Sequence, residues 1–154
     1  MNRGIRIGAL AGLLAGIVFG LAMGFLPVRA PDGGRISMLL FTAQALHAQS
    51  PAIGWVTYLA YGVVIGGLFG WLLRGRALDE GPALVLGGAY GLGWWVLAGL
   101  VLMPALLGRV PFSSSALDVV RPIALVLLAG HLLYGLLLGM MFGLTSNRIA
   151  GRPA

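Results

Sequence analysis

The sequence contains no cysteine and no lysine, and only four of its 154 residues are acidic. The absence of cysteine excludes disulfides and thiolate metal sites. All ten basic residues are arginines, and the formal net charge is +6. In a soluble protein this charge would suggest nucleic-acid binding. Here the arginines border long apolar stretches, so we interpret them as markers of membrane topology and expect no nucleic-acid partner.

Charge of either sign is scarce, because only 9% of the residues are charged and 59% are hydrophobic. Soluble domains carry roughly 25% charged residues, so the composition predicts an integral membrane protein in a lipid bilayer. A membrane-spanning helix needs about 20 mostly apolar residues. Four uncharged stretches meet this length once Ser50-Pro51 divides the longest of them. The sequence predicts a single transmembrane domain over residues 1–154, with spans at about 5–26, 53–73, 83–107 and 122–145.

A glycine-rich segment occurs twice in the chain, at one constant offset of 73 residues. Tyr61, Gly62, Gly66, Phe69 and Gly70 recur as Tyr134, Gly135, Gly139, Phe142 and Gly143. A repeat unit of two spans gives parallel repeats, related by an axis along the membrane normal. We therefore expect an all-α four-helix bundle made of two tandem two-helix repeats, at about residues 1–76 and 77–150.

The loops between the spans are also patterned. Residues 28–36 are expected to form a polar loop, and residues 37–47 a short interfacial helix capped by Ser37, with His47 at headgroup level. A second short amphipathic turn is expected within the loop 108–121.

Glycine ladders are the candidate helix-packing sites. In the first span glycine recurs at every fourth position, which places the glycines in one stripe along the helix. Such a stripe allows close approach of another helix, either within the chain or in another protein. Its five steps exceed what one neighbour in a four-helix bundle requires, which favours another protein. The predicted packing residues are Gly8, Gly12, Gly16, Gly20, Gly24, Gly62, Gly66, Gly70, Gly135, Gly139 and Gly143.

Arginine placement predicts the orientation of the spans. Cytoplasmic loops carry an excess of basic residues, and the side that holds both termini has more arginines than the other side. Both termini are therefore expected in the cytoplasm. That side has Arg3, Arg6, Arg74, Arg76, Arg148 and Arg152, and the other has Arg29, Arg35, Arg109 and Arg121.

His131 is the only histidine expected at membrane depth, where ionisable groups are candidates for function. Tyr134 follows one helical turn later on the same face. His131 and Tyr134 could form a site for a haem or a pigment, with a ring nitrogen of the histidine ligating the iron. The alternative is a neutral histidine that packs and hydrogen-bonds to another helix. A bis-histidine site would need a second deep histidine, which this sequence lacks.

No aspartate or glutamate lies within a predicted span, which disfavours a proton-coupled or sodium-coupled transporter. The serines at 113–115 have no clear base nearby, and no catalytic residues or metal ligands are expected. We therefore predict a non-enzyme: an accessory or scaffold subunit that packs through glycine-rich faces with membrane-protein partners or copies of itself. The alternatives are a small self-assembling channel or permease for a small solute, and a haem-binding or pigment-binding subunit.

Residues spread over about 55–140 carry a family resemblance. They are Ala89, Tyr90, Gly91, Trp95, Pro104, Leu107, Gly108, Pro111, His131, Tyr134 and Gly135. This set resembles the small four-helix bacterial inner-membrane proteins of the YagU kind. The resemblance implies a multi-pass protein of the bacterial inner membrane, and it implies no active-site residues.

Overall fold

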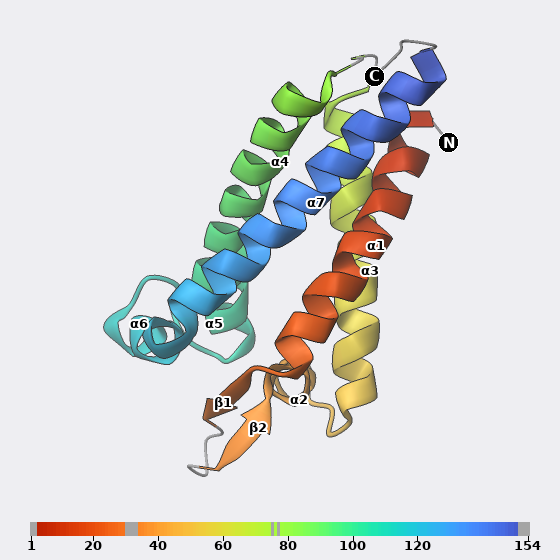
Figure 1. Cartoon of the computed structure of the whole chain (residues 1–154). Coiled ribbons are helices and arrows are strands. Elements are labelled where there is room, and N and C mark those ends of the chain that lie inside the picture. The colour runs from red at the N-terminus through yellow and green to blue at the C-terminus, as the bar shows by residue number, and fades with distance from the viewer. Residues whose placement is uncertain (1–2, 30–33, 75, 77, 151–154) are drawn as a thin grey trace.

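In the computed structural model, residues 3–29, 34–74, 76 and 78–150 are described. Four helices are long and apolar enough to cross a membrane: Arg3–Gly24, Pro51–Leu72, Glu80–Leu106 and Ala124–Thr145. The predicted helical class and the four span-length helices are confirmed. The first described residues of the first helix and the last described residues of the last helix lie near each other, at the same end of the bundle (Figure 1). Arg152 lies outside the described residues.

The first half of the chain contains α1 (Arg3–Gly24), β1 (Pro27–Arg29), β2 (Arg35–Ser37), α2 (Met38–Ala45) and α3 (Pro51–Leu72). The expected polar loop at 28–36 differs in one detail from the structure, which contains two short strands there. β1 and β2 form a two-stranded antiparallel sheet, in which Val28 pairs with Ile36. Both are β-branched residues that suit a strand, and Val28 is buried.

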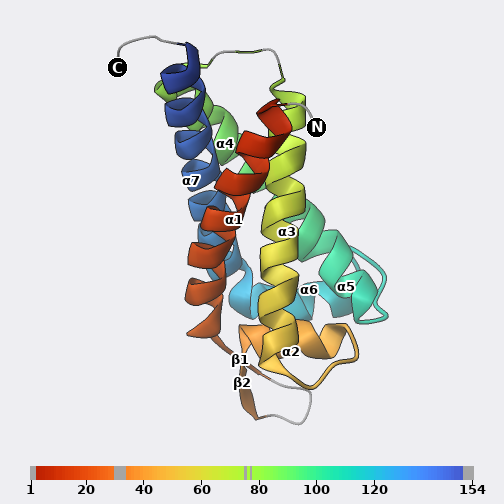
Figure 2. The same cartoon turned by 90° about the vertical axis from the view of Figure 1, so that its right-hand side faces the viewer.

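α2 begins where the sequence predicts, because the Ser37 side chain accepts a hydrogen bond from the Leu40 N–H at 3.2 Å. The helix lies across the ends of α1 and α3 (Figure 2), and most of its side chains are buried. Two residues beyond the end of the helix, His47 has a left-handed backbone conformation with φ 60°, and this residue is exposed. The Ala48 N–H then donates to the Ala43 carbonyl at 2.9 Å, which closes the helix end.

The second half contains α4 (Glu80–Trp94), η1 (Trp95–Leu102), α5 (Met103–Leu106), α6 (Ser114–Val120), η2 (Arg121–Ile123) and α7 (Ala124–Ala150). The third span is continuous through α4, η1 and α5, but η1 is a π-helix that the sequence does not predict. Pro104 lies two residues after the last residue of η1. Proline has no N–H to donate, and its ring clashes with the carbonyl four residues earlier in an α-helix. The wider π turns before Pro104 accommodate both the missing hydrogen bond and the bulk of the proline ring.

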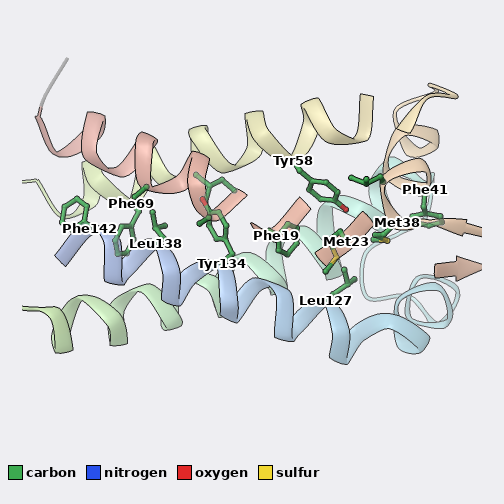
Figure 3. Close-up of a cluster of buried hydrophobic side chains, with 14 of the residues drawn as sticks. Phe19, Met23, Met38, Phe41, Tyr58, Phe69, Leu127, Tyr134, Leu138 and Phe142 are labelled. Carbon is green, nitrogen blue, oxygen red and sulfur yellow. The ribbon is translucent and has the colours of Figure 1, made fainter. Parts of the chain in front are cut away.

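The four long helices associate as two tight pairs, α1 with α3 and α4 with α7, and α1 also packs against α7. The buried side chains gather between the two pairs. Figure 3 shows them in a row, from Phe142 and Phe69 at one end, through Tyr134 and Phe19, to Met38 and Phe41 at the other. The candidate site lies along this row, towards its α2 end.

Candidate functional site

Glycines bring the backbones of α1 and α3 into direct contact. A Cβ atom added to Gly12 would lie 2.8 Å from Cα of Gly66, and one added to Gly66 would lie 2.6 Å from Cα of Gly12. A Cβ on Gly16 would lie 3.3 Å from Cα of Gly62. No real side chain tolerates the two shorter distances, so the close approach requires glycine on both helices.

The favoured expectation that the α1 stripe meets another protein is therefore wrong, because this chain already covers the stripe. Gly8, Gly12 and Gly16 face α3, while a Cβ on Gly20 would meet the Trp55 ring and one on Gly24 would meet the Leu39 side chain. The stripe thus contacts α3 along most of its length and α2 at its end. Two neighbouring helices, rather than one, therefore cover the five glycines of the stripe.

Glycines join α4 to α7 in the same manner. A Cβ on Gly87 would lie 2.8 Å from Cα of Gly139, and one on Gly135 would lie 2.9 Å from Cα of Gly91. Gly143 lies against the side chain of Ala83, 3.1 Å from a Cβ placed on the glycine. Gly62, Gly66 and Gly70 of α3 and Gly135, Gly139 and Gly143 of α7 thus all lie at close helix contacts.

An aromatic layer fills the space between the two helix pairs. Phe19 of α1 contacts Tyr58 and His131 edge-to-face, with ring centroids 5.3 and 5.2 Å apart. Further along the bundle Phe69 contacts Phe142 at 5.6 Å. Edge-to-face contacts of this kind contribute roughly 0.5–1.5 kcal/mol beyond area burial. Rings rather than an open path occupy the middle of this bundle.

Two tyrosine hydroxyls connect the helix pairs. The Tyr134 O–H donates to the carbonyl of Gly62 at 2.9 Å, and the Tyr90 O–H donates to the carbonyl of Ile65 at 2.8 Å. Both acceptors are backbone carbonyls in the middle of α3. Tyr134, predicted as a possible partner for a cofactor, has its hydroxyl engaged in this helix-to-helix contact.

His131 is buried, with 5% of its surface exposed. Its Nδ1 lies 2.8 Å from the carbonyl oxygen of Leu127, one turn earlier in α7. A carbonyl only accepts, so Nδ1 carries the hydrogen and donates, and in the neutral ring Nε2 is then an acceptor. The hydrogen bond of His131 therefore lies within α7, whereas one of the two expectations was a hydrogen bond to another helix.

A cavity of about 150 Å³ lies beside His131, where α3, η1 and α7 meet near α2. Its wall is almost entirely apolar and includes Tyr58, Tyr61, Gly99, Met103 and His131. Pockets for drug-sized molecules measure roughly 300–1,000 Å³. A haem macrocycle exceeds the available space, so the geometry does not fit the haem or pigment that the sequence suggested for His131.

The cavity and the π-helix are the features that sequence reasoning missed. The available signal was Gly99 followed five residues later by Pro104, which indicates a local break in the third span. Isolated π turns inside α-helices occur frequently at functional sites. Among the described residues, no three histidine, aspartate or glutamate side chains cluster in a way that could hold a metal ion.

Comparisons with protein-family models, with curated proteins and with solved structures yield no match for this chain. The resemblance to small inner-membrane proteins of the YagU kind stays a prediction from the sequence.

Proposed function

We propose that the protein is a non-catalytic subunit of a membrane assembly and that the outer face of α4 is its docking face. The supporting observation is that the third span is the least covered by the rest of the chain. Only 17% of an 18-residue apolar stretch of this span is buried, against 28% in the second span and 44% in the first and fourth. A partner helix packed on α4 would raise the buried share of the third span towards that of the other spans.

The outer face of α4 also carries small residues. Gly81, Ala89 and Gly93 share one stripe with the larger Val85, at every fourth position, and all four are exposed. A Cβ on Gly81 or Gly93 would have no neighbour within 4 Å. Lipid gives no hydrophobic drive for helix association, so small residues that permit close backbone approach favour it instead. The glycine faces of the other three spans are already used within the chain.

Crosslinking from α4 tests this proposal, and the natural absence of cysteine makes single-cysteine variants specific. Ala89→Cys, labelled with a benzophenone maleimide in native membranes, should give a crosslinked band of higher mass on illumination. Mass spectrometry of that band shows whether the partner is a second copy or another protein.

Val64→Cys is the matched control, because Val64 is 68% exposed on the outer face of α3. It should remain at the monomer mass under the same illumination. If both variants give equal crosslinking, or if neither does, α4 is not a docking face.

We also infer that the bundle consists of two tandem parallel repeats. The matching geometry supports this, since the Gly12 contact with Gly66 has the same 2.8 Å spacing as the Gly87 contact with Gly139. In this arrangement each repeat supplies one tight pair, and the aromatic layer holds the two pairs together.

We propose that both termini face the cytoplasm in the inner membrane of a bacterium, as the arginine excess favours. Reporter fusions placed after Ala154 and within residues 110–116 should report opposite sides of the membrane. The fusion after Ala154 is expected to be active with a cytoplasmic reporter. Fusions that report the same side would contradict a chain with four spans.

A further inference from the structure

The cavity beside His131 lies on the flank of the bundle. Leu102 and Leu106, which line its η1 and α5 side, are 43% and 50% exposed, so this wall continues onto the outer apolar surface. The opposite wall is formed by α3, through Tyr58 and Tyr61. A molecule that enters between α3 and η1 therefore comes from the hydrocarbon of the bilayer rather than from water.

The volume of the cavity limits what can occupy it. An α-helix with its side chains is roughly 10–12 Å in diameter, so a helix from another protein cannot enter a space of about 150 Å³. An engineered apolar cavity of about the same volume in another protein stays dry and binds benzene. The space suits one end of a single slender apolar molecule.

Besides the Thr57 hydroxyl, which donates to a backbone carbonyl of its own helix, three polar features lie among the residues that line the cavity. The first is Nε2 of His131, which has no hydrogen-bond partner among the described residues and is an acceptor in the neutral ring. The second is the hydroxyl pair of Thr42 and Tyr58, 2.9 Å apart. One of these hydroxyls donates to the other, and the accepting hydroxyl keeps its own hydrogen available. The third is the Tyr61 hydroxyl, which is buried and has no hydrogen-bond partner among the described residues. The wall therefore offers an acceptor at Nε2, a donor at the hydroxyl pair, and a hydroxyl at Tyr61 that can donate or accept.

A hydroxyl group complements this wall, because it both donates and accepts. A hydrocarbon chain leaves Nε2 unpaired, and a phosphate or ammonium headgroup would bring a charge into a wall that has no opposite charge. We propose that the cavity binds the hydroxyl end of a long-chain alcohol from the bilayer, whose O–H donates to Nε2 of His131. This site is separate from the docking face on α4, and neither depends on the other.

Photolabelling tests the site in the intact protein. Proteoliposomes that contain the purified protein are illuminated with hexadecanol that carries a diazirine next to its hydroxyl end. We expect label on η1 and α5, at residues such as Leu102 and Met103. Unlabelled hexadecanol should compete about two- to tenfold better than hexadecane, the range that corresponds to one hydrogen bond. This comparison uses only the natural protein, so it does not depend on any variant folding.

Two variants separate the shape of the cavity from its chemistry. A Cβ on Gly99 would lie 3.7 Å from the nearest Trp95 atom, which is ordinary contact, so a side chain can start there, and we expect Gly99→Leu to fill part of the cavity that Gly99 lines. It should reduce labelling about tenfold, whereas Ala60→Leu at an exposed position of α3 should not change it. His131→Phe keeps a ring and removes Nε2, so the advantage of hexadecanol over hexadecane should shrink, because the alcohol then keeps only the wall's hydroxyl groups as partners.

The proposal fails if hexadecane competes as well as hexadecanol with the natural protein. It also fails if Gly99→Leu, with an unchanged melting temperature and elution volume, is labelled as strongly as the natural protein. Label found only on faces away from η1, α5 and α3 would also contradict the proposal, because the alcohol would then contact the protein only as bulk lipid does.

Discussion

Gly66→Ala should lower the free energy of unfolding by about 1–3 kcal/mol, the usual cost of overpacking a well-packed core. The added methyl carbon would lie 2.6 Å from Cα of Gly12, so α1 and α3 have to move apart. Both groups in this contact are backbone, and neither can rotate away as a side chain can. Separating the helices also weakens the neighbouring contacts of Gly8 and Gly62. The measurement is thermal unfolding of the detergent-solubilised protein, with monodispersity as a second readout.

Gly67→Ala is the matched control, one residue further along the same helix. A Cβ at this position would find its nearest neighbours at 3.8 Å, in the side chains of Ala9 and Ile5. This variant should unfold at the temperature of the natural protein or slightly above it, because alanine restricts the unfolded chain more than glycine does. Equal destabilisation by both variants would show that α1 and α3 do not approach through Gly66.

The same comparison applies to the second pair. Gly87→Ala places a methyl carbon 2.8 Å from Cα of Gly139, while Gly93→Ala on the same helix adds a methyl group in open space. Only the first should destabilise the protein. Agreement between the two pairs would support the proposal that the chain is a tandem repeat.

Phe19→Ala is the second substitution expected to have a large effect, a loss of roughly 3–5 kcal/mol of stability by the precedent of aromatic truncations in protein cores. The Phe19 ring joins the two helix pairs. It contacts Tyr58 of its own pair and His131 of the other, and it lies so close to Gly130 that a Cβ there would be 2.8 Å from the ring. Its removal leaves a void where α1 crosses α7.

Phe25→Ala provides the control, because Phe25 is 87% exposed beyond the end of α1. It removes the same side chain without opening a void, and the unfolding temperature should hardly change. Comparable effects of the two substitutions would mean that the aromatic layer does not hold the pairs together. The size of the difference between the two variants measures how much one ring of that layer contributes.

The four spans and the start of α2 are predictable from the sequence because they depend on local properties. Lipid offers backbone groups no hydrogen-bond partners, so an apolar stretch of sufficient length becomes a helix whatever its neighbours are. The Ser37 cap is equally local, since its partner is the Leu40 N–H three residues later. The glycine ladders are also visible in the sequence as surfaces suited to close approach.

Which surface each ladder meets is decided only in the tertiary structure. A glycine stripe has no side chains to specify a partner, so the α1 stripe suits another protein as well as it suits α3. The contacts of the whole bundle assign it to α3. For the same reason, α4 is left with an uncovered face that its sequence does not distinguish from the covered ones.

The surroundings of His131 show the same division. The sequence identifies a histidine at membrane depth, but it does not show that Leu127 accepts the hydrogen of Nδ1 or that Phe19 packs against the ring. The cavity depends on the π turns before Pro104 and on residues from α1, α2, α3 and α7, which are far apart in the chain. The spans, their helical form and the positions where backbones can touch follow from local polarity and size, so they can be predicted from the residues alone. The tertiary structure decided the helix partners, the cavity and the free face of α4, because each of these depends on how distant side chains fill one shared space.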